Sequence, residues 1–306
     1  MWFKQIQVFQ LTNLSCYAAE KMLEKLEPLR FTPCLPSMPS SIGWVPLLDE
    51  EGAPLTRTFN GYTMLCLQIE DKILPATVVN QTLSEKIKQI ELNEARKVRQ
   101  KEKLSLKDEL IITLLPRAFT KLTRIYAYLD TKNRWLVLGS ASPKKAEQFI
   151  SLLKKSFNDE IQPIEVTKPA AIMTSWLKHQ HYPASFSIEK KACVLQDPQQ
   201  ENRIIRCQQQ DLFANSVQSF IKDGCEAIQV ALCWQDRVHF VLSNDFSLRS
   251  IQFEEEIVAQ TKDIAETKQQ QFDADFIMMT ETFSGLLTEL LALFTTNNIV
   301  PIAKQA

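Results

Sequence analysis

Glycine is scarce in this sequence, with only six in 306 residues, or about 2% where roughly 7% is usual. No two of them have the spacing of a loop that cradles phosphate through backbone N–H groups. The sequence therefore argues against an ATPase and against a dinucleotide-dependent enzyme, and it predicts no cofactor.

Cysteine is present but has no pattern. The seven cysteines are odd in number and none stands in a C-x-x-C motif, which argues against both a disulfide framework and a zinc ribbon. Cys193, Cys207, Cys225 and Cys233 lie in apolar, strand-like segments, so we expect reduced and mostly buried thiols. No apolar run approaches the ~20 residues of a membrane span, and the N-terminus lacks the layout of a signal peptide. These absences predict a cytoplasmic protein with no membrane association.

Positive charge is concentrated in one stretch. The formal net charge is −1, yet residues 80–124 hold eleven Lys/Arg against six Asp/Glu, a local net charge of +5 that leaves −6 for the rest. Such a local cluster is typical of a surface that binds a polyanion. A solvated helix face is the alternative interpretation of a charge run.

Helical signals accompany this charge. Pro75 suits the start of a helix, and Leu83, Ile87 and Ile90 recur at helical spacing as one apolar stripe. Ser105 with Asp108 resembles a capping box and predicts a second helix, 106–115, which Pro116 ends. We therefore predict a basic helical finger over 76–124, with an apolar root and a poorly packed basic end.

The remaining chain alternates short strands and amphipathic helices. Residues 1–75 and 125–165 predict a first α+β unit, into which the finger is inserted, and 166–306 predict a second α+β unit with a C-terminal helix over 275–294. Residues 227–234 and 237–242 predict a hairpin that turns at 235–236. The expected fold class is α+β, with antiparallel sheets and packed helices.

Several short stretches, taken together and in order, resemble the bacterial recombination-associated protein RdgC family over nearly the whole length. Each stretch alone is weak. They are Trp2-Phe3-Lys4, Phe31-Thr32-Pro33-Cys34, Gly43-Trp44-Val45-Pro46, Lys72-Ile73-Leu74-Pro75, Ser105-Leu106-Lys107-Asp108-Glu109, Leu114-Leu115-Pro116-Arg117-Ala118-Phe119, Lys144-Lys145-Ala146-Glu147, Gln210-Asp211-Leu212 and Phe272-Asp273-Ala274-Asp275-Phe276.

The resemblance implies a non-catalytic protein that binds double-stranded DNA largely without regard to sequence. Crescent-shaped monomers would close into a ring-shaped homodimer around DNA, and in the nucleoid this would restrain RecA-dependent recombination. By position, Phe119 matches a family residue that closes the ring at the finger tips. Gln209 and Gln210 match a hinge-like contact. The family is often basic just before Gln210, whereas this chain has Gln208 and Gln209, which moves phosphate contacts onto the finger.

Sequence-independent binding of DNA needs phosphate contacts, which Lys and Arg supply. A two-fold ring would present each contact twice, and about six simultaneous contacts would give a slope of log K against log salt of about −5. The predicted DNA-binding residues are Arg96, Lys97, Arg99, Lys101, Lys103, Lys107, Arg117, Lys121 and Arg124.

Three alternatives stay open from the residues alone. Phe119 could be a core aromatic, and the finger could be a coiled-coil arm for a partner protein through Leu83, Ile87 and Ile90. Asp273 and Asp275 with Glu254–Glu256 could hold a nuclease metal, although an aspartate there more often caps a helix. His179 and His181 have no third ligand nearby, so no metal site and no enzyme activity are expected.

Overall fold

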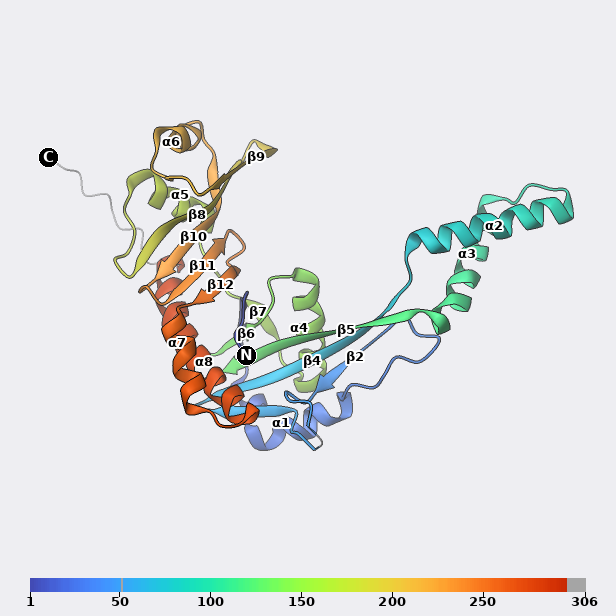
Figure 1. Cartoon of the computed structure of the whole chain (residues 1–306), viewed down its shortest axis with the longest axis horizontal. Coiled ribbons are helices and arrows are strands. Elements are labelled where there is room, and N and C mark those ends of the chain that lie inside the picture. Colours follow the sequence, from blue (N-terminus) through green and yellow to red (C-terminus); the bar gives the residue numbers. More distant parts are fainter. Residues whose placement is uncertain (51, 296–306) are drawn as a thin grey trace. The chain divides into compact units, whose positions relative to one another are not determined.

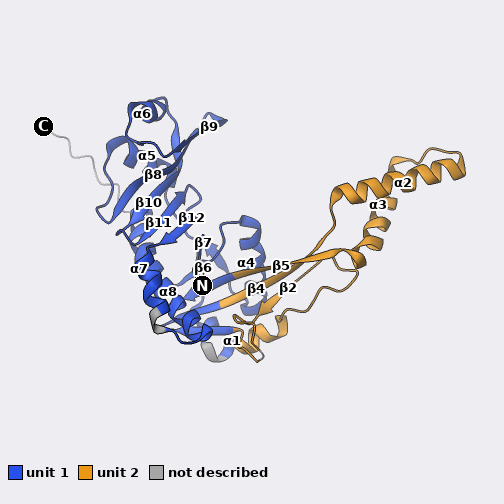
Figure 2. Cartoon of the chain, in the orientation of Figure 1, with its two compact units in different colours: residues 1–22, 56–64, 126–306 blue, residues 23–55, 65–125 orange. Residues whose placement is uncertain are grey.

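The computed structural model describes residues 1–50 and 52–295, which fall into two compact units (Figure 2). Unit 1 comprises residues 1–22, 56–64 and 126–306, and unit 2 comprises residues 23–55 and 65–125. All of the segment 76–124 thus belongs to unit 2.

Antiparallel strands and eight α-helices make up the part of the chain that the structure describes (Figure 1). The strands are β1 (Gln7–Leu11), β2 (Ser40–Val45), β3 (Thr56–Phe59), β4 (Tyr62–Ile73), β5 (Phe119–Asp130), β6 (Trp135–Leu138), β7 (Ile161–Pro163), β8 (Phe186–Asp197), β9 (Gln200–Gln208), β10 (Glu226–Trp234), β11 (Val238–Ser243) and β12 (Leu248–Phe253). The α-helices are α1 (Ala19–Leu26), α2 (Ala76–Glu94), α3 (Gln100–Leu114), α4 (Pro143–Phe157), α5 (Pro169–His179), α6 (Asn215–Lys222), α7 (Glu255–Ile264) and α8 (Lys268–Phe294). Short 3-10 turns are η1 (Leu14–Tyr17), η2 (Glu27–Leu29) and η3 (Leu115–Arg117).

The first sheet has the strand order β2-β4-β5-β6-β1-β7, with β3 beside β4. Strands β2 and β4 pair antiparallel within unit 2. In unit 1 the end of β5 (residues 127–130) pairs with β6, β6 with β1 and β1 with β7, all antiparallel. Every residue from Tyr62 to Ile69 of β4 is buried, so both faces of this strand are covered.

Strand β5 begins at Phe119, so residues 119–124 are strand and not part of a helical finger as predicted. Phe119, Thr120 and Thr123 are aromatic or β-branched, and such residues favour a strand over a helix.

The second sheet lies wholly in unit 1, in the order β12-β11-β10-β8-β9. The predicted hairpin is confirmed: β10 and β11 pair antiparallel, and Trp234 lies opposite Val238. Gln235 and Asp236 between them both adopt positive φ angles, 50° and 51°. Two such residues are what a tight hairpin turn requires to match the twist of its strands.

Helix α8 is the core helix of unit 1. It begins at Lys268, earlier than predicted, because Thr267 and Gln270 form a capping box. Its Phe276 ring packs against Phe59 and Tyr128, and its Phe283 ring packs against Phe253. A window of this helix is long and apolar enough to cross a membrane by length and composition, and half of that window is buried inside the protein. Such burial is typical of a core helix.

Asp275 on α8 is a buried carboxylate with three donors. Thr261 Oγ1 and Gln271 Nε2 each donate to Oδ1 at 2.8 Å, and the Met1 ammonium pairs with Oδ2. Burial alone would raise the pKa of Asp275, but these donors outweigh it and the pKa is lowered.

Replacing Asp275 by asparagine should lower the free energy of unfolding of unit 1 by about 2 kcal/mol at neutral pH, because charged hydrogen bonds are lost. A carboxyl group whose folded pKa is depressed stabilises above its unfolded pKa and loses this contribution as pH falls through its folded pKa. The difference between wild type and Asp275→Asn in urea unfolding should therefore shrink on acidification below about pH 4. Asp273→Asn is the control, because burial raises the pKa of Asp273. An equal acid-dependent loss in both variants would contradict this account.

Candidate nucleic-acid interface

Helices α2 and α3 form a helical hairpin within unit 2, which Figure 1 shows in cyan and green. Helix α2 ends at Glu94, and the next residue, Ala95, has a left-handed φ of 51°. Helix α3 begins at Gln100 and not at Leu106, so Ser105 lies inside the helix and does not cap it. The strong helix formers at 100–104 extend the helix toward the turn, which overrides the capping signal.

The turn of the hairpin, residues 95–99, is held by side chains. The Val98 N–H donates to Glu91 Oε1 at 3.1 Å, and the Val98 side chain is buried. Arg96 donates to Glu94 through Nε at 2.6 Å and to both oxygens of Glu102, at 2.7 and 2.6 Å. This hydrogen bonding from Arg96 lowers the pKa of Glu102. The Arg96 charge is therefore already compensated, and a phosphate would have to compete with two carboxylates.

Arg124 is also engaged, on strand β5. Its Nη1 donates to Asp49 Oδ2 at 3.1 Å, and its Nε donates to Gln68 Oε1 at 3.0 Å. The hydrogen bond from Arg124 lowers the pKa of Asp49. Of the predicted phosphate contacts, Arg96 and Arg124 are thus the ones with carboxylate partners.

The other predicted DNA-binding residues form no ion pair with any residue in 1–50 or 52–295. Lys97, Arg99 and Lys101 are exposed and lie on the turn and the first turn of α3. Lys103 and Lys107 are half-buried and four residues apart, so they share one face of α3. Arg117 and Lys121 are exposed on η3 and β5. Positively charged residues without an ion pair among the described residues are therefore densest at 97–101.

Phe119 is a surface residue, with 85% of its area exposed. The core interpretation is therefore wrong. Phe119 begins β5, just after η3, whereas the helical turn is at 95–99, so it does not lie at that turn. Other large apolar side chains of unit 2 are also exposed, among them Leu92, Leu104, Ile112 and Leu122. The stripe predicted for a coiled-coil arm, Leu83, Ile87 and Ile90, is only half-exposed. Exposed apolar side chains gathered in one segment indicate a protein-contact surface.

Gln209 and Gln210 are exposed and follow the last residue of β9. Gln209 has a positive φ of 52° and lines a shallow depression with Glu189, Lys190 and Lys191 of β8. Lys191 Nζ lies 3.1 Å from a Glu189 oxygen. The fold thus brings two lysines beside Gln209. Sequence reasoning missed them because they lie on a different strand, although the Glu-Lys-Lys run itself is visible in the sequence.

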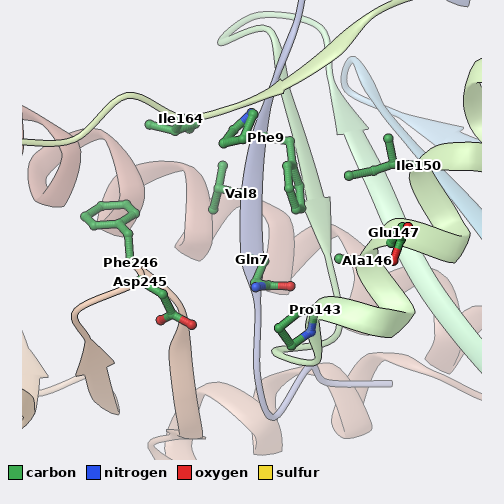
Figure 3. A pocket seen from close by; sticks show the side chains of 11 residues that line it. Gln7, Val8, Phe9, Pro143, Ala146, Glu147, Ile150, Ile164, Asp245 and Phe246 are labelled. Carbon is green, nitrogen blue, oxygen red and sulfur yellow. The ribbon is translucent and has the colours of Figure 1, made fainter. Parts of the chain in front are cut away.

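A cleft of about 330 Å³ in unit 1 is mostly apolar and lacks the positive charge of the helical hairpin (Figure 3). Apolar side chains line most of it, and its polar lining residues are Gln7, Glu147 and Asp245, with no Lys or Arg among them. The Gln7 Oε1 atom is buried and has no hydrogen-bond partner within the described residues. Phosphate needs donors and positive charge, so this cleft does not extend the basic surface.

Three of the five acids of the nuclease alternative are paired with other groups. Asp273 pairs with Arg57 at 3.2 Å, Asp275 pairs with the Met1 ammonium, and Glu254 contacts His239 Nε2 at 2.5 Å. Asp273 and Asp275 lie inside α8, so the expectation that one of them caps this helix is wrong. Across residues 1–50 and 52–295, no three His, Cys, Asp or Glu side chains gather as a metal site would require.

Comparison with known proteins shows which family the chain belongs to. The family model described as "Putative exonuclease, RdgC" matches residues 1–297. The "Recombination-associated protein RdgC" of Yersinia pestis (strain Pestoides F) is 35% identical over 297 residues, which cover 95% of this chain and 97% of the relative. The protein of the same name from Yersinia enterocolitica serotype O:8 / biotype 1B has the same identity and coverage. A match over nearly the full length of both proteins means that this chain belongs to the RdgC family of recombination-associated proteins.

Proposed function

We propose that this protein is a non-catalytic, largely sequence-independent double-stranded DNA-binding protein. It acts in the cytoplasm at the nucleoid, forms a homodimeric ring around DNA and restrains RecA-dependent recombination. The observation that carries the proposal is the group of exposed lysines and arginines at 97–101, whose charge no carboxylate compensates with an ion pair among the described residues. Membership in a recombination-associated family supports the same function.

The chemistry of this surface suits the DNA backbone more than the bases. Lys97, Arg99 and Lys101 are long, mobile cations on a turn and a helix start, and phosphates are their natural partners. Base readout instead needs planar donors and acceptors held rigidly in a groove. Binding should therefore depend strongly on salt and little on sequence.

Dimerisation would bring two such surfaces onto one duplex. Phe119 and the exposed apolar residues of unit 2 offer one self-complementary contact, since a two-fold interface uses the same patch on both subunits. Gln209 and Gln210 offer a second contact, with Lys190 and Lys191 supplying nearby charge. Two separate contacts of this kind are what a closed ring of two subunits requires. The division into a first α+β unit (1–75 and 125–165), a finger at 76–124 whose last six residues are strand, and a second α+β unit (166–306) belongs to this proposal.

Binding to linear and closed-circular duplex DNA at several salt concentrations tests the proposal. We expect a slope of log K against log salt of about −5 and slower escape from circles than from short linear fragments. Light scattering on the same samples should show a dimer throughout. Absence of DNA binding at low salt would overturn the proposal and leave the finger as an arm for a partner protein.

The description of the matching family names one other candidate function, that of an exonuclease. That function predicts degradation of DNA ends that requires a divalent metal ion and is abolished by Asp273→Asn. The engagement of Asp273 by Arg57 argues against this role. DNA that stays full-length after prolonged incubation with magnesium or manganese would support binding without cleavage. DNA that is shortened from its ends would support the exonuclease.

A further inference from the structure

Two cysteines face each other across the β8–β9 strand pair. Cys193 and Cys207 are cross-strand partners in the antiparallel register, and both are buried, free thiols. Directly opposed residues have Cα atoms about 4.5 to 5.5 Å apart and side chains on the same face of the sheet. A disulfide spans Cα distances of about 4.4 to 6.8 Å. We propose that Cys193 and Cys207 form an oxidation-sensitive disulfide site.

Among the strand pairs that the structure describes, Cys193 and Cys207 are the only two cysteines directly opposite each other. On its other side Cys193 lies opposite Val230 of β10. Cys233, also buried on β10, lies opposite Ser187 and His239, and neither can form a disulfide. Cys233 is therefore a natural internal control for the pair.

Burial makes the site slow to react at neutral pH. It raises the pKa of Cys193 to about 12, with a further contribution from the charge of Cys207, and it also raises the pKa of Cys207. Only the thiolate attacks an oxidant, so the rate should increase with pH. Cys207 lies on the edge strand and is 5% exposed, against 1% for Cys193, so Cys207 should react first.

The oxidant must be small enough to reach buried thiols, and hydrogen peroxide meets this requirement. The Cys207 thiolate attacks one peroxide oxygen, the O–O bond breaks, and the leaving hydroxide takes a proton to become water. The sulfenic acid formed on Cys207 is then attacked by the Cys193 sulfur. The S–O bond breaks, and hydroxide leaves as water with the Cys193 proton. The two sulfurs lose two electrons in total, and peroxide is reduced to two waters.

The disulfide would lock the end of the hairpin from which the 208–210 segment leaves. Cys207 is followed by Gln208, which ends β9 opposite Ala192, and then by Gln209. A covalent link at this point holds the start of the segment against β8 even when the β9 hydrogen bonds open. The inference concerns the thiols alone and stands whether or not the protein binds DNA.

The test is oxidation of the full, folded chain with hydrogen peroxide near neutral pH and at about pH 9, followed by alkylation, digestion and mass spectrometry without reduction. We expect a linked peptide pair that contains Cys193 and Cys207, formed faster at the higher pH. The unfolding temperature should increase by roughly 5 °C, as expected when a loop of about 15 residues is closed, and dithiothreitol should reverse this change.

Cys207→Ala should abolish the link, whereas Cys233→Ala should leave it unchanged. If both thiols of the pair remain open to alkylation after oxidation at the higher pH, or if either links to another cysteine instead, the inference is wrong. Because wild type itself is mapped, the result does not depend on how well the alanine variants fold.

Discussion

Replacing Lys97, Arg99 and Lys101 together by glutamate is expected to weaken binding of any duplex sequence by at least about 100-fold at moderate salt. The three side chains are exposed and form no ion pair among the described residues, so each is available to a phosphate. A dimer would lose about six contacts, and the slope of log K against log salt should fall from about −5 toward zero. Fluorescence anisotropy with several unrelated duplexes, titrated across salt, measures both quantities.

Two comparisons make this result specific. Lys144, Lys154 and Lys155 on α4 are basic residues of unit 1, and their joint replacement by glutamate changes the net charge equally. This control should retain most of the affinity. Arg96→Gln should cost less affinity than loss of a free cation, because Glu94 and Glu102 already compensate its charge. If the triple variant at 97–101 binds within twofold of wild type, the hairpin turn is not the DNA contact.

Phe119→Glu is expected to weaken the proposed dimer by at least about 100-fold. An exposed aromatic at the centre of a contact typically contributes about 2 kcal/mol or more, and 1.4 kcal/mol corresponds to a factor of ten. In a two-fold contact the change occurs on both subunits, so two buried carboxylates would face each other without partners. Sedimentation velocity across a range of protein concentrations measures the shift from dimer to monomer.

Leu23→Glu is the matched control, because Leu23 is another exposed apolar residue of unit 2, at 44% of its area. It should leave the dimer intact. Circular dichroism should show that both variants keep their helix content, since neither side chain is buried. A dimer that is equally stable with Phe119→Glu would show that this phenylalanine lies outside the contact. In that case the contact at Gln209 and Gln210 would hold the subunits together, and changing these two residues should dissociate the dimer.

Local patterns in the sequence were enough to predict much of the fold. The alternation at 227–242 and the turn residues Gln235 and Asp236 predicted the β10–β11 hairpin, because a two-residue period and a tight turn are local properties. The apolar periodicity at 275–294 predicted the core helix, and the charge count placed the basic surface within 80–124. Element ends were less well predicted, because propensity at 100–104 competed with the capping signal at Ser105.

The tertiary structure decided which charged side chains are free of carboxylate partners and which cysteines lie opposite each other. Composition treats Arg96 and Lys97 alike, but the chain reversal at 95–99 brings Glu102 to Arg96 and leaves Lys97 exposed. Strand register likewise brings Cys193 opposite Cys207, which residue spacing could not show. The cysteine pairing depends on a contact between two strands. The Arg96 pairing depends on the geometry of a turn, which the propensities of its residues do not determine. The sequence by itself therefore determined the kinds of element and the location of the charge, and the folded chain determined which residues remain available to a partner.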